Sequence, residues 1–334
     1  MRKQLRFLLL LWVFGCTLFF SCGIVLGGPP HPPPDTSLVA DFGAQGGLCR
    51  YSYSTWSQLA FASANLVVEA PNIGLVANFP GQGLFRYLFG NNWTQLTPND
   101  SVENLLGIVS WLFADFGSLG LWKYDGAWHN LSYSNPNMML AYSGMLIANF
   151  PGQGLYELDL EGSMWTQLTP NDTVQALIVV KTPWGAPGFV YADYGTLGLW
   201  KYDGSTWAQI TPADANLLGS HRGDLVANFP GHGLWRYDGT TWTLLTPNDT
   251  VQALVEVGEQ LYADYGTLGL WKHDDPWVQI SSADPNLLGS LPVVTSSVST
   301  LVANFPGYGL YRYNGSWTLL TGNDGVTNMV GVDW

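Results

Sequence analysis

The amino-acid sequence predicts an all-β chain that folds as an eight-bladed β-propeller. One unit of roughly 37 residues recurs eight times, and each copy holds four short apolar segments separated by turn signals, the pattern of a four-stranded blade. The copies begin at Leu38, Leu75, Leu112, Leu146, Val190, Leu225, Leu261 and Leu301. The segment 326–332 supplies the inner strand that the first copy lacks. We therefore expect antiparallel blades in a ring that the C-terminal strand closes by joining the first blade, which removes the open sheet edge.

Turn residues divide each copy into strands. Asp-Gly or Asn-Gly pairs tolerate the positive φ of tight hairpin turns, and four copies carry such a pair before the outer strand. These pairs are Asp125-Gly126, Asp203-Gly204, Asp238-Gly239 and Asn314-Gly315. Gly and Pro together make up 59 of the 334 residues, and no stretch shows a convincing 3.6-residue apolar period. Helices should therefore be few.

The first 28 residues have the composition of an export segment. Arg2, Lys3 and Arg6 precede an uncharged run over 7–26, which is long for a signal peptide and long enough to cross a bilayer. The residues before Cys22 resemble a bacterial lipobox, and that resemblance implies lipidation of Cys22. A cleaved signal peptide, a lipid anchor and an uncleaved anchor all remain open, and each places the protein outside the cell or at its surface.

Two further segments follow the export segment. Residues 29–37 are rich in proline and are predicted to form a stiff, extended linker. Residues 38–334 hold the eight repeats and form the propeller. We expect the chain to be monomeric and to contact a membrane only through its N-terminal segment.

Aromatic residues recur at two positions of the repeat. The outer-strand position holds Trp56, Trp93, Trp128, Trp165, Trp207, Trp242, Trp277 and Trp317. The second position holds Phe85, Trp122, Tyr156, Trp200, Trp235, Trp271 and Tyr311. Large rings suit the wedge between neighbouring blades, which widens outward, so both positions are interpreted first as packing. A platform for stacking sugar rings is the alternative interpretation.

Basic residues also share one position of the repeat. Seven of the nine basic residues beyond residue 28 occupy it, namely Arg50, Arg86, Lys123, Lys201, Arg236, Lys272 and Arg312. Glu157 interrupts the series. We expect each aliphatic stem to pack between blades while its charge pairs with a loop Asp or an aromatic face. A ring of anion sites is the alternative.

Polar turn residues alternate between two types of copy. Odd copies carry Asp41, Asp115, Asp193 and Asp264, and even copies carry Asn78, Asn149, Asn228 and Asn304. Even copies also carry Asp100, Asp172, Asp249 and Asp324 after the tryptophan strand. In a propeller both sets of turns lie on one face, so these twelve residues define the candidate ligand-binding face. Capping of tight turns is the structural interpretation, and Ca²⁺ held by carboxylates is a weaker alternative because the spacing matches no known Ca²⁺ loop.

The composition excludes or disfavours several classes of function. Beyond residue 28 the chain carries nine basic residues against all 25 acidic ones, a net charge of −16, which argues against a nucleic-acid partner. None of the four His residues of the repeats stands in a recognisable nucleophile setting or metal-ligand spacing. Residues 192–200 are similar to the tryptophan-docking motif of eight-bladed quinoprotein dehydrogenases, but the match is two residues shorter. That resemblance implies a shared way of locking blades and carries no active-site residue across.

The repeat order resembles kelch-like and related propeller repeats. An exported ring of near-identical, aromatic-rich blades also resembles propeller lectins, in which several weak and equivalent sites give avidity for a glycan surface. These resemblances imply a non-enzymatic binding protein that recognises surface carbohydrate through one face and needs no cofactor. A scaffold that binds a cell-surface protein is the alternative, and a propeller enzyme is the less favoured one.

Overall fold

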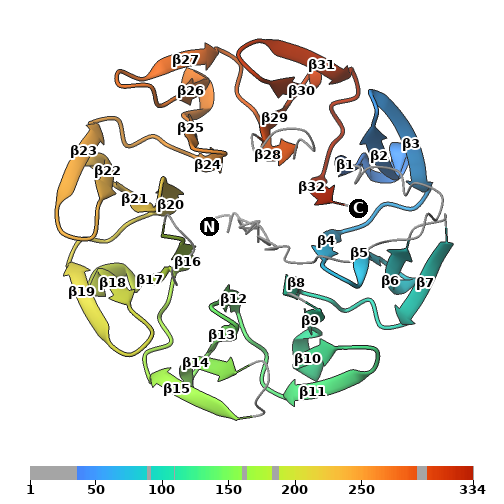
Figure 1. The fold of residues 1–334 in the computed structure, drawn as a ribbon, viewed down its shortest axis with the longest axis horizontal. Coiled ribbons are helices and arrows are strands. Elements are labelled where there is room, and N and C mark those ends of the chain that lie inside the picture. The colour runs from blue at the N-terminus through green and yellow to red at the C-terminus, as the bar shows by residue number, and fades with distance from the viewer. Residues whose placement is uncertain are drawn as a thin grey trace, which may run out of the picture.

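A computed structural model describes residues 36–88, 92–108, 110–159, 164–182, 188–291 and 299–333 of the chain. Cys22, the export segment and most of the proline-rich linker lie outside these residues. The predicted all-β fold is confirmed: eight four-stranded antiparallel sheets surround a central axis (Figure 1). In the part of the chain that is described, helical turns are short. They are α1 (Gly43–Gly46), η1 (Gly117–Leu119), η3 (Gly195–Leu197) and η4 (Gly266–Leu268).

Each blade contributes one strand to each of four concentric positions. The inner strands are β32 (Asn328–Asp333), β4 (Leu66–Ala70), β8 (Asn104–Ile108), β12 (Met138–Tyr142), β16 (Ala176–Val180), β20 (Leu217–His221), β24 (Ala253–Val257) and β28 (Leu287–Leu291). The second strands are β1 (Thr36–Asp41), β5 (Gly74–Phe79), β9 (Trp111–Asp115), β13 (Met145–Phe150), β17 (Phe189–Asp193), β21 (Asp224–Phe229), β25 (Gln260–Asp264) and β29 (Thr300–Phe305).

The remaining strands lie farther from the axis. The third strands are β2 (Leu48–Ser52), β6 (Gly83–Leu88), β10 (Leu121–Tyr124), β14 (Gly154–Asp159), β18 (Leu199–Tyr202), β22 (Gly233–Tyr237), β26 (Leu270–Lys272) and β30 (Gly309–Tyr313). The outer strands are β3 (Thr55–Ala60), β7 (Asn92–Thr97), β11 (Trp128–Ser132), β15 (Trp165–Thr169), β19 (Trp207–Thr211), β23 (Trp242–Thr246), β27 (Val278–Ser281) and β31 (Trp317–Thr321).

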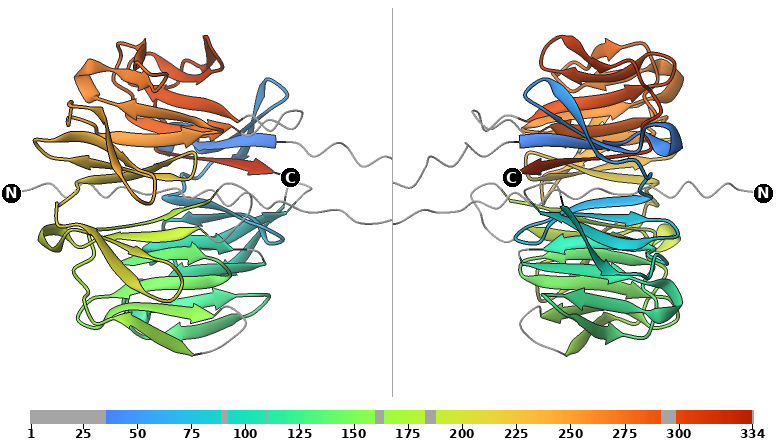
Figure 2. Two further views of the ribbon diagram at one scale, coloured as in Figure 1. Left: turned by 60° about the vertical axis from the view of Figure 1, so that its left-hand side comes forward. Right: turned by 90° about the vertical axis from the view of Figure 1, so that its right-hand side faces the viewer.

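The ring closes through its two ends, as the sequence predicts. Strand β32 pairs with β1 in antiparallel register from Thr36 opposite Asp333 to Asp41 opposite Asn328, so blade 1 takes its inner strand from the C-terminus. The two strands lie side by side in the edge-on views of Figure 2. The first strand begins at Thr36, two residues inside the segment that the sequence assigned to the linker.

The core lies between neighbouring blades rather than within one sheet. Between blades 2 and 3, for example, Val76 and Leu84 pack with Leu112 and Ala114, and all four side chains are fully buried. Seven further clusters repeat this arrangement around the ring. Alternate residues of the second strands therefore face different neighbours, which is why these strands are apolar throughout.

The outer-strand tryptophans join neighbouring blades. In six blades the indole Nε1 donates to a main-chain oxygen of the preceding outer strand: Trp56 to Leu320, Trp93 to Leu59, Trp128 to Leu96, Trp165 to Leu131, Trp277 to Leu245 and Trp317 to Ile280. Each ring also packs on aromatic neighbours of its own blade, such as Phe79 and Tyr87 beside Trp93, at centroid distances of 5.2 Å. These contacts support the packing interpretation of this position.

Two faces of the ring follow from the strand order. One face, here called the turn face, carries the turns between the second and third strands and the loops that connect blades. The opposite face, the hairpin face, carries the connections between inner and second strands and between third and outer strands. Strand β1 starts on the hairpin face, because Asp41 at its other end lies on the turn face.

Candidate functional site

The four odd-blade aspartates lie at the ends of second strands and are buried. Asp41, Asp115, Asp193 and Asp264 are at most 3% exposed. In each, one carboxylate oxygen accepts a hydrogen bond from the main-chain N–H of the glycine two residues later, at 2.9 to 3.2 Å. Asp41 also accepts hydrogen bonds from Ser63 and Ala64, in the loop to the next blade. These contacts are those expected of turn caps.

The four even-blade asparagines occupy the equivalent positions and are completely buried. Each Nδ2 donates to the side-chain oxygen of an Asn in the loop before the blade and to the main-chain oxygen of the Asp in the loop after it. For Asn228 these acceptors are Asn216 and Asp249, both at 2.8 Å. Asn78, Asn149 and Asn304 make the same pair of bonds at 2.8 to 3.1 Å. Each asparagine thus joins two interblade loops.

The alternation of Asp and Asn has a local cause. In odd blades the second residue after the Asp is a glycine, whose N–H meets the carboxylate. In even blades that residue is a proline, for example Pro230 after Asn228, and proline has no N–H to donate. The Oδ1 atoms of all four asparagines are accordingly buried without a hydrogen-bond partner. A charged carboxylate there would face two oxygen acceptors, so the neutral amide is required.

The second set of aspartates lies on the same face but nearer to solvent. Asp100, Asp172, Asp249 and Asp324 are half-buried, and one oxygen of each accepts the main-chain N–H of Gly81, Gly152, Gly231 or Gly307 in the adjacent turn. The sequence-predicted residues therefore all lie on the turn face, eight inside it and four near its surface. The eight buried residues organise the loops and are not open to a ligand.

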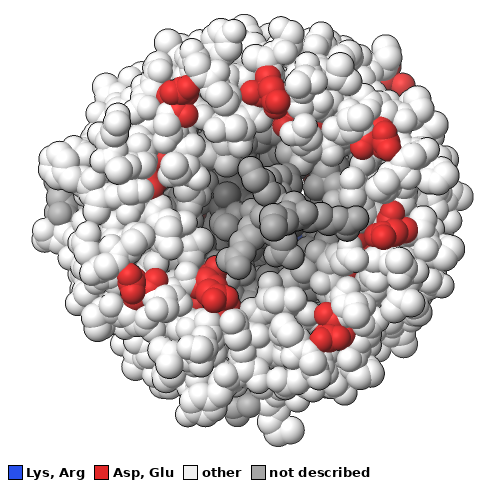
Figure 3. All heavy atoms as spheres, turned by 180° about the vertical axis from the view of Figure 1, so that it is seen from behind, with Lys and Arg blue, Asp and Glu red and all other residues white. Residues whose placement is uncertain are grey.

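The turn face is acidic. Figure 3 shows Asp and Glu side chains spaced around the ring. Besides the four half-buried aspartates, Glu103, Asp214 and Asp284 are exposed in the interblade loops. All nine Lys and Arg residues of the described chain lie on third strands or near the ends of inner strands on the hairpin side. The turn face therefore presents acid without compensating base.

Burial changes the ionisation of three odd-blade aspartates, Asp115, Asp193 and Asp264. Removal from water raises the pKa of Asp115 and Asp193 to about 7 and that of Asp264 to about 6, although the main-chain donor of the turn opposes this rise. Asp193 illustrates the cause, because its second carboxylate oxygen is buried without a hydrogen-bond partner. Burial therefore favours the protonated form of these three carboxyl groups compared with an exposed aspartate.

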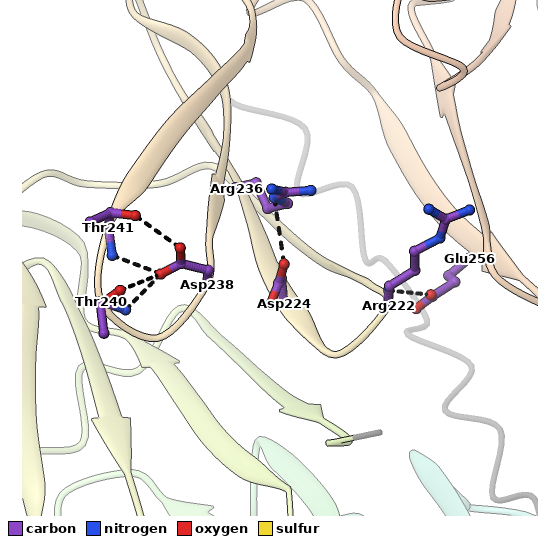
Figure 4. Close-up of polar contacts among 7 residues, drawn as sticks. All are labelled: Arg222, Asp224, Arg236, Asp238, Thr240, Thr241 and Glu256. Atoms are coloured by element: carbon purple, nitrogen blue, oxygen red, sulfur yellow. Dashed lines mark hydrogen bonds and ion pairs between the residues drawn. The ribbon is translucent and has the colours of Figure 1, made fainter. Parts of the chain in front are cut away.

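The basic residues at the repeated position of the third strands form their contacts toward the hairpin face. Lys123 lies 3.3 Å from Asp125, Lys272 lies 2.8 Å from Asp274, and Arg236 lies 3.4 Å from Asp224. Figure 4 shows the last pair beside Arg222, whose main-chain N–H donates to Glu256 of the next blade. Lys201 differs, because its ammonium lies 3.5 Å from the centroid of the Phe189 ring. Pairing with acids or aromatic faces, as predicted, accounts for these four basic residues.

The exposed residues of the turn face were not singled out by the repeat pattern. The turns of blades 3, 5 and 7 present Leu119, Leu197 and Leu268, each 50 to 54% exposed. The main-chain oxygen of each accepts the indole N–H of a half-buried tryptophan, Trp122, Trp200 or Trp271. The even blades present Gln82, Gln153, His232 and Tyr308 at the same level, all exposed. These seven residues are here called the turn tips. Each directly precedes a glycine that stands at the start of the third strand or just before it, and this shared position in the repeat would have identified them.

Two aromatic side chains on this face break the repeat. Phe61 is 86% exposed and Tyr133 is 83% exposed. They stand where most other copies carry a proline after the outer strand.

A cavity of about 2160 Å³ borders the inner strands. Its wall is mainly apolar, with Leu217, Leu254 and Met329 among the lining residues, and Glu256 introduces a carboxylate. Within the described residues, no group of three or more His, Cys, Asp or Glu side chains is placed to hold a metal ion, and no helix is long and apolar enough to cross a membrane.

Comparisons with known proteins support the fold alone. No protein-family model and no curated protein matches the sequence. Among solved structures, the computationally designed Ika8 protein aligns at a TM-score of 0.60 with 11% identity, over 85% of this chain and 97% of that chain. AztD of Citrobacter koseri aligns at 0.57 with 11% identity, over 90% and 98%. Sqt1 of Saccharomyces cerevisiae aligns at 0.55 with 10% identity, over 91% and 94%.

A weaker likeness concerns a larger protein. The extracellular domain of the putative hybrid two-component system BT3049 from B. thetaiotaomicron aligns at a TM-score of 0.46 with 10% identity, over 78% of this chain and 48% of that chain. The present chain thus spans about half of that protein's length.

Proposed function

We propose that this protein is an exported, non-enzymatic binding protein that recognises surface carbohydrate through the turn face. The observation that carries the proposal is the ring of repeated, exposed turn tips beside half-buried aromatic rings. In blades 3, 5 and 7, a leucine tip adjoins a tryptophan whose N–H is already bonded to that tip. This hydrogen bond fixes the indole ring in place without a ligand, and the exposed part of the indole surface is available for stacking against a sugar.

The neighbouring groups suit the edges of a sugar ring. Gln209 and Gln279 also donate to the oxygens of Leu197 and Leu268, at 2.9 Å, which leaves their amide oxygens to accept hydrogen bonds. Three near-identical sites in one chain would each bind weakly, and a surface bearing many copies of one glycan would be bound with avidity. The acidic turn face favours neutral or cationic glycans over acidic ones.

A glycan array tests this proposal with the full chain. We expect binding to a defined group of neutral glycans, and loss of that binding when Leu119, Leu197 and Leu268 are all replaced by Asp. These leucines are exposed, so stability should change little. Asn314→Ser on the hairpin face is the control and should bind as the unaltered chain does. The absence of any glycan bound above background, or binding unaffected by the three replacements, would refute carbohydrate recognition at the tips.

A cell-surface protein partner is the second candidate, and Phe61 and Tyr133 favour it. Both rings lie on the turn face, and aromatic residues are enriched in protein interfaces. Cross-linking of the full chain on intact cells, followed by identification of the captured protein, tests this candidate. Capture of one partner that is lost on replacing both residues by Ser, with no signal on the glycan array, would replace the carbohydrate proposal.

Export is part of the same proposal. It rests on the basic and apolar N-terminal segment, which lies outside the described residues. Because the chain enters the ring on the hairpin face, a retained anchor would leave the turn face directed away from the membrane. Binding sites on that face would then be accessible to large ligands.

A further inference from the structure

The wedge between blades 5 and 6 departs from the repeat. In six blades the outer-strand indole N–H is bonded to the preceding blade, but Nε1 of Trp242 in this wedge is buried without a hydrogen-bond partner among the described residues, as is Nε1 of Trp207 in the wedge between blades 4 and 5. The Trp242 ring is also more nearly parallel to the tyrosine beside it than its counterparts are. It lies at 32° to Tyr237, whereas Trp93 lies at 54° to Tyr87 and Trp128 at 53° to Tyr124.

A cleft of about 450 Å³ lies beside Trp242 in this wedge. Blade 5 supplies Phe189, Lys201, Gln209 and the carboxylate of Asp203 to its wall, and blade 6 supplies Tyr237, Thr240 and Trp242. Small-molecule sites typically have volumes of about 300–1,000 Å³ and combine apolar walls with a few polar groups. The size and composition of the cleft suit one small ring.

Lys201 brings a positive charge to the cleft, and no carboxylate among the described residues pairs with it. Lys123 and Lys272, at the same position of the repeat, each pair with the Asp two residues later. The corresponding Asp203 is instead held by its own turn, where one oxygen accepts hydrogen bonds from Ser205 and from the main-chain N–H of Thr206. The ammonium of Lys201 is left over the Phe189 ring.

The other carboxylate near the cleft is occupied in the same way. Asp238 accepts hydrogen bonds from Thr240 and Thr241 in its own turn, as Figure 4 shows. The hydroxyl of Tyr237 donates to Gly239 at 2.8 Å. Both carboxylates are therefore held by their own turns, and the Lys201 ammonium is the group of the cleft that is left to be satisfied, so a ligand that satisfies it must present an acceptor.

We propose that this cleft binds a carboxylate carried on a six-membered ring, with Lys201 as its counter-ion and Trp242 as its aromatic wall. The ring would lie against the apolar side chains of Ile210 and Trp242, and the hydroxyl of Thr240 and the amide oxygen of Gln209 are at hand for ring substituents. A uronic acid unit and an apolar cyclic acid share this chemistry. Gln209, whose amide nitrogen donates to the Leu197 tip, lines the cleft as well, but Lys201 and Trp242 are not among the residues of the tips proposed above.

Calorimetric titration of the full chain with glucuronate, cyclohexanecarboxylate and glucose tests the proposal. We expect one binding site per chain for at least one carboxylate and none for glucose. Tighter binding of glucuronate would identify a sugar acid as the ligand class, and tighter binding of cyclohexanecarboxylate an apolar acid. If neither carboxylate binds, the proposal is wrong.

Variants locate the binding. Lys201→Gln should weaken carboxylate binding at least about tenfold, and Trp242→Leu, which removes the aromatic wall, should weaken it by a smaller factor. Lys123→Gln removes the equivalent charge in blade 3 and is the matched control, with unchanged affinity expected. Melting curves establish that each variant is folded. Carboxylate binding that survives Lys201→Gln unchanged would also overturn the proposal, and it would leave the glycan-array result unaffected.

Discussion

The indole nitrogen of Trp93 donates a hydrogen bond of 2.9 Å to the main-chain oxygen of Leu59 in the preceding blade. This bond crosses the wedge between blades 1 and 2, and five other tryptophans make its equivalent. We predict that Trp93→Phe lowers the free energy of unfolding by about 1–3 kcal/mol, because the ring is shortened and the Leu59 oxygen loses its donor. Denaturant unfolding of the full chain measures the change.

Trp242 is the matched comparison, because its indole nitrogen has no partner to lose. Trp242→Phe should therefore cost less stability than Trp93→Phe, although both substitutions remove the same atoms. Equal losses would mean that ring packing alone, and not the interblade hydrogen bond, determines the cost.

The even-blade asparagines should not tolerate a charge. Asn228 is completely buried and donates to two oxygens, so Asn228→Asp would bring a carboxylate against two acceptors. We expect a loss of about 3 kcal/mol or more, seen as a large fall in melting temperature. Asn314→Asp makes the same chemical change in an exposed hairpin turn whose sister copies already carry Asp. It should change stability by less than about 0.5 kcal/mol, and a loss equal to that of Asn228→Asp would contradict this account.

The buried aspartates predict an unusual dependence of stability on pH. Their pKa values of about 6 to 7 in the folded state lie above the ordinary value of about 3.9 for an unfolded chain. Between about pH 4 and 7 the folded state therefore binds more protons than the unfolded state, and stability must fall as pH rises. Burial lowers the pKa of His221 to about 4 and also lowers that of His273, which has the opposite sign over the same range. Burial raises the pKa of Asp224 as well, so four carboxyl groups act against two histidines.

We therefore expect a higher melting temperature at pH 5 than at pH 8. Asp193→Asn removes one of the four carboxyl groups while keeping its shape, and it should make the difference smaller. A melting temperature that rises steadily from pH 5 to pH 8 would show that these carboxyl groups are ionised in the folded protein.

The eight-bladed ring could be predicted from the sequence because every blade needs the same residues to pack against its neighbours and to form its turns. Trp at the outer strand and Gly at the turns recur for the fold, so their spacing revealed eight blades and the closing role of 326–332. The same reasoning fails for the site, because a residue needed in every blade is one that the fold buries. Asp193 and Asn228 recur for this reason, and burial excludes them from direct contact with a ligand.

The unpaired Lys201 could not be recognised from its own position. Both Lys123 and Lys201 are followed by Asp two residues later, and the pattern predicts the same ion pair for each. The difference lies in the turn: Ser205 and Thr206 hold Asp203, whereas Ala127 cannot provide a hydroxyl beside Asp125. The hydroxyl residues Ser205 and Thr206, in the turn after Lys201, were therefore the feature of the sequence that predicts an unpaired lysine.

Removal of the closing strand should prevent the ring from folding. Val326 and Met329 pack in the cluster between blades 8 and 1, while Val330 and Val332 pack in the cluster between blades 1 and 2, so the strand supports both sides of blade 1. Each such buried side chain contributes about 1.5–3 kcal/mol, and four of them approach the whole stability of a typical domain, roughly 5–15 kcal/mol. Deletion of 326–334 should therefore abolish the cooperative melting transition, and a synthetic peptide of these residues should restore it by pairing with β1. Because a scrambled peptide of the same composition cannot place these side chains in register, it should not rescue folding. A truncated chain that melts like the intact one would show that β32 is dispensable and that the ring is held by its other seven blades.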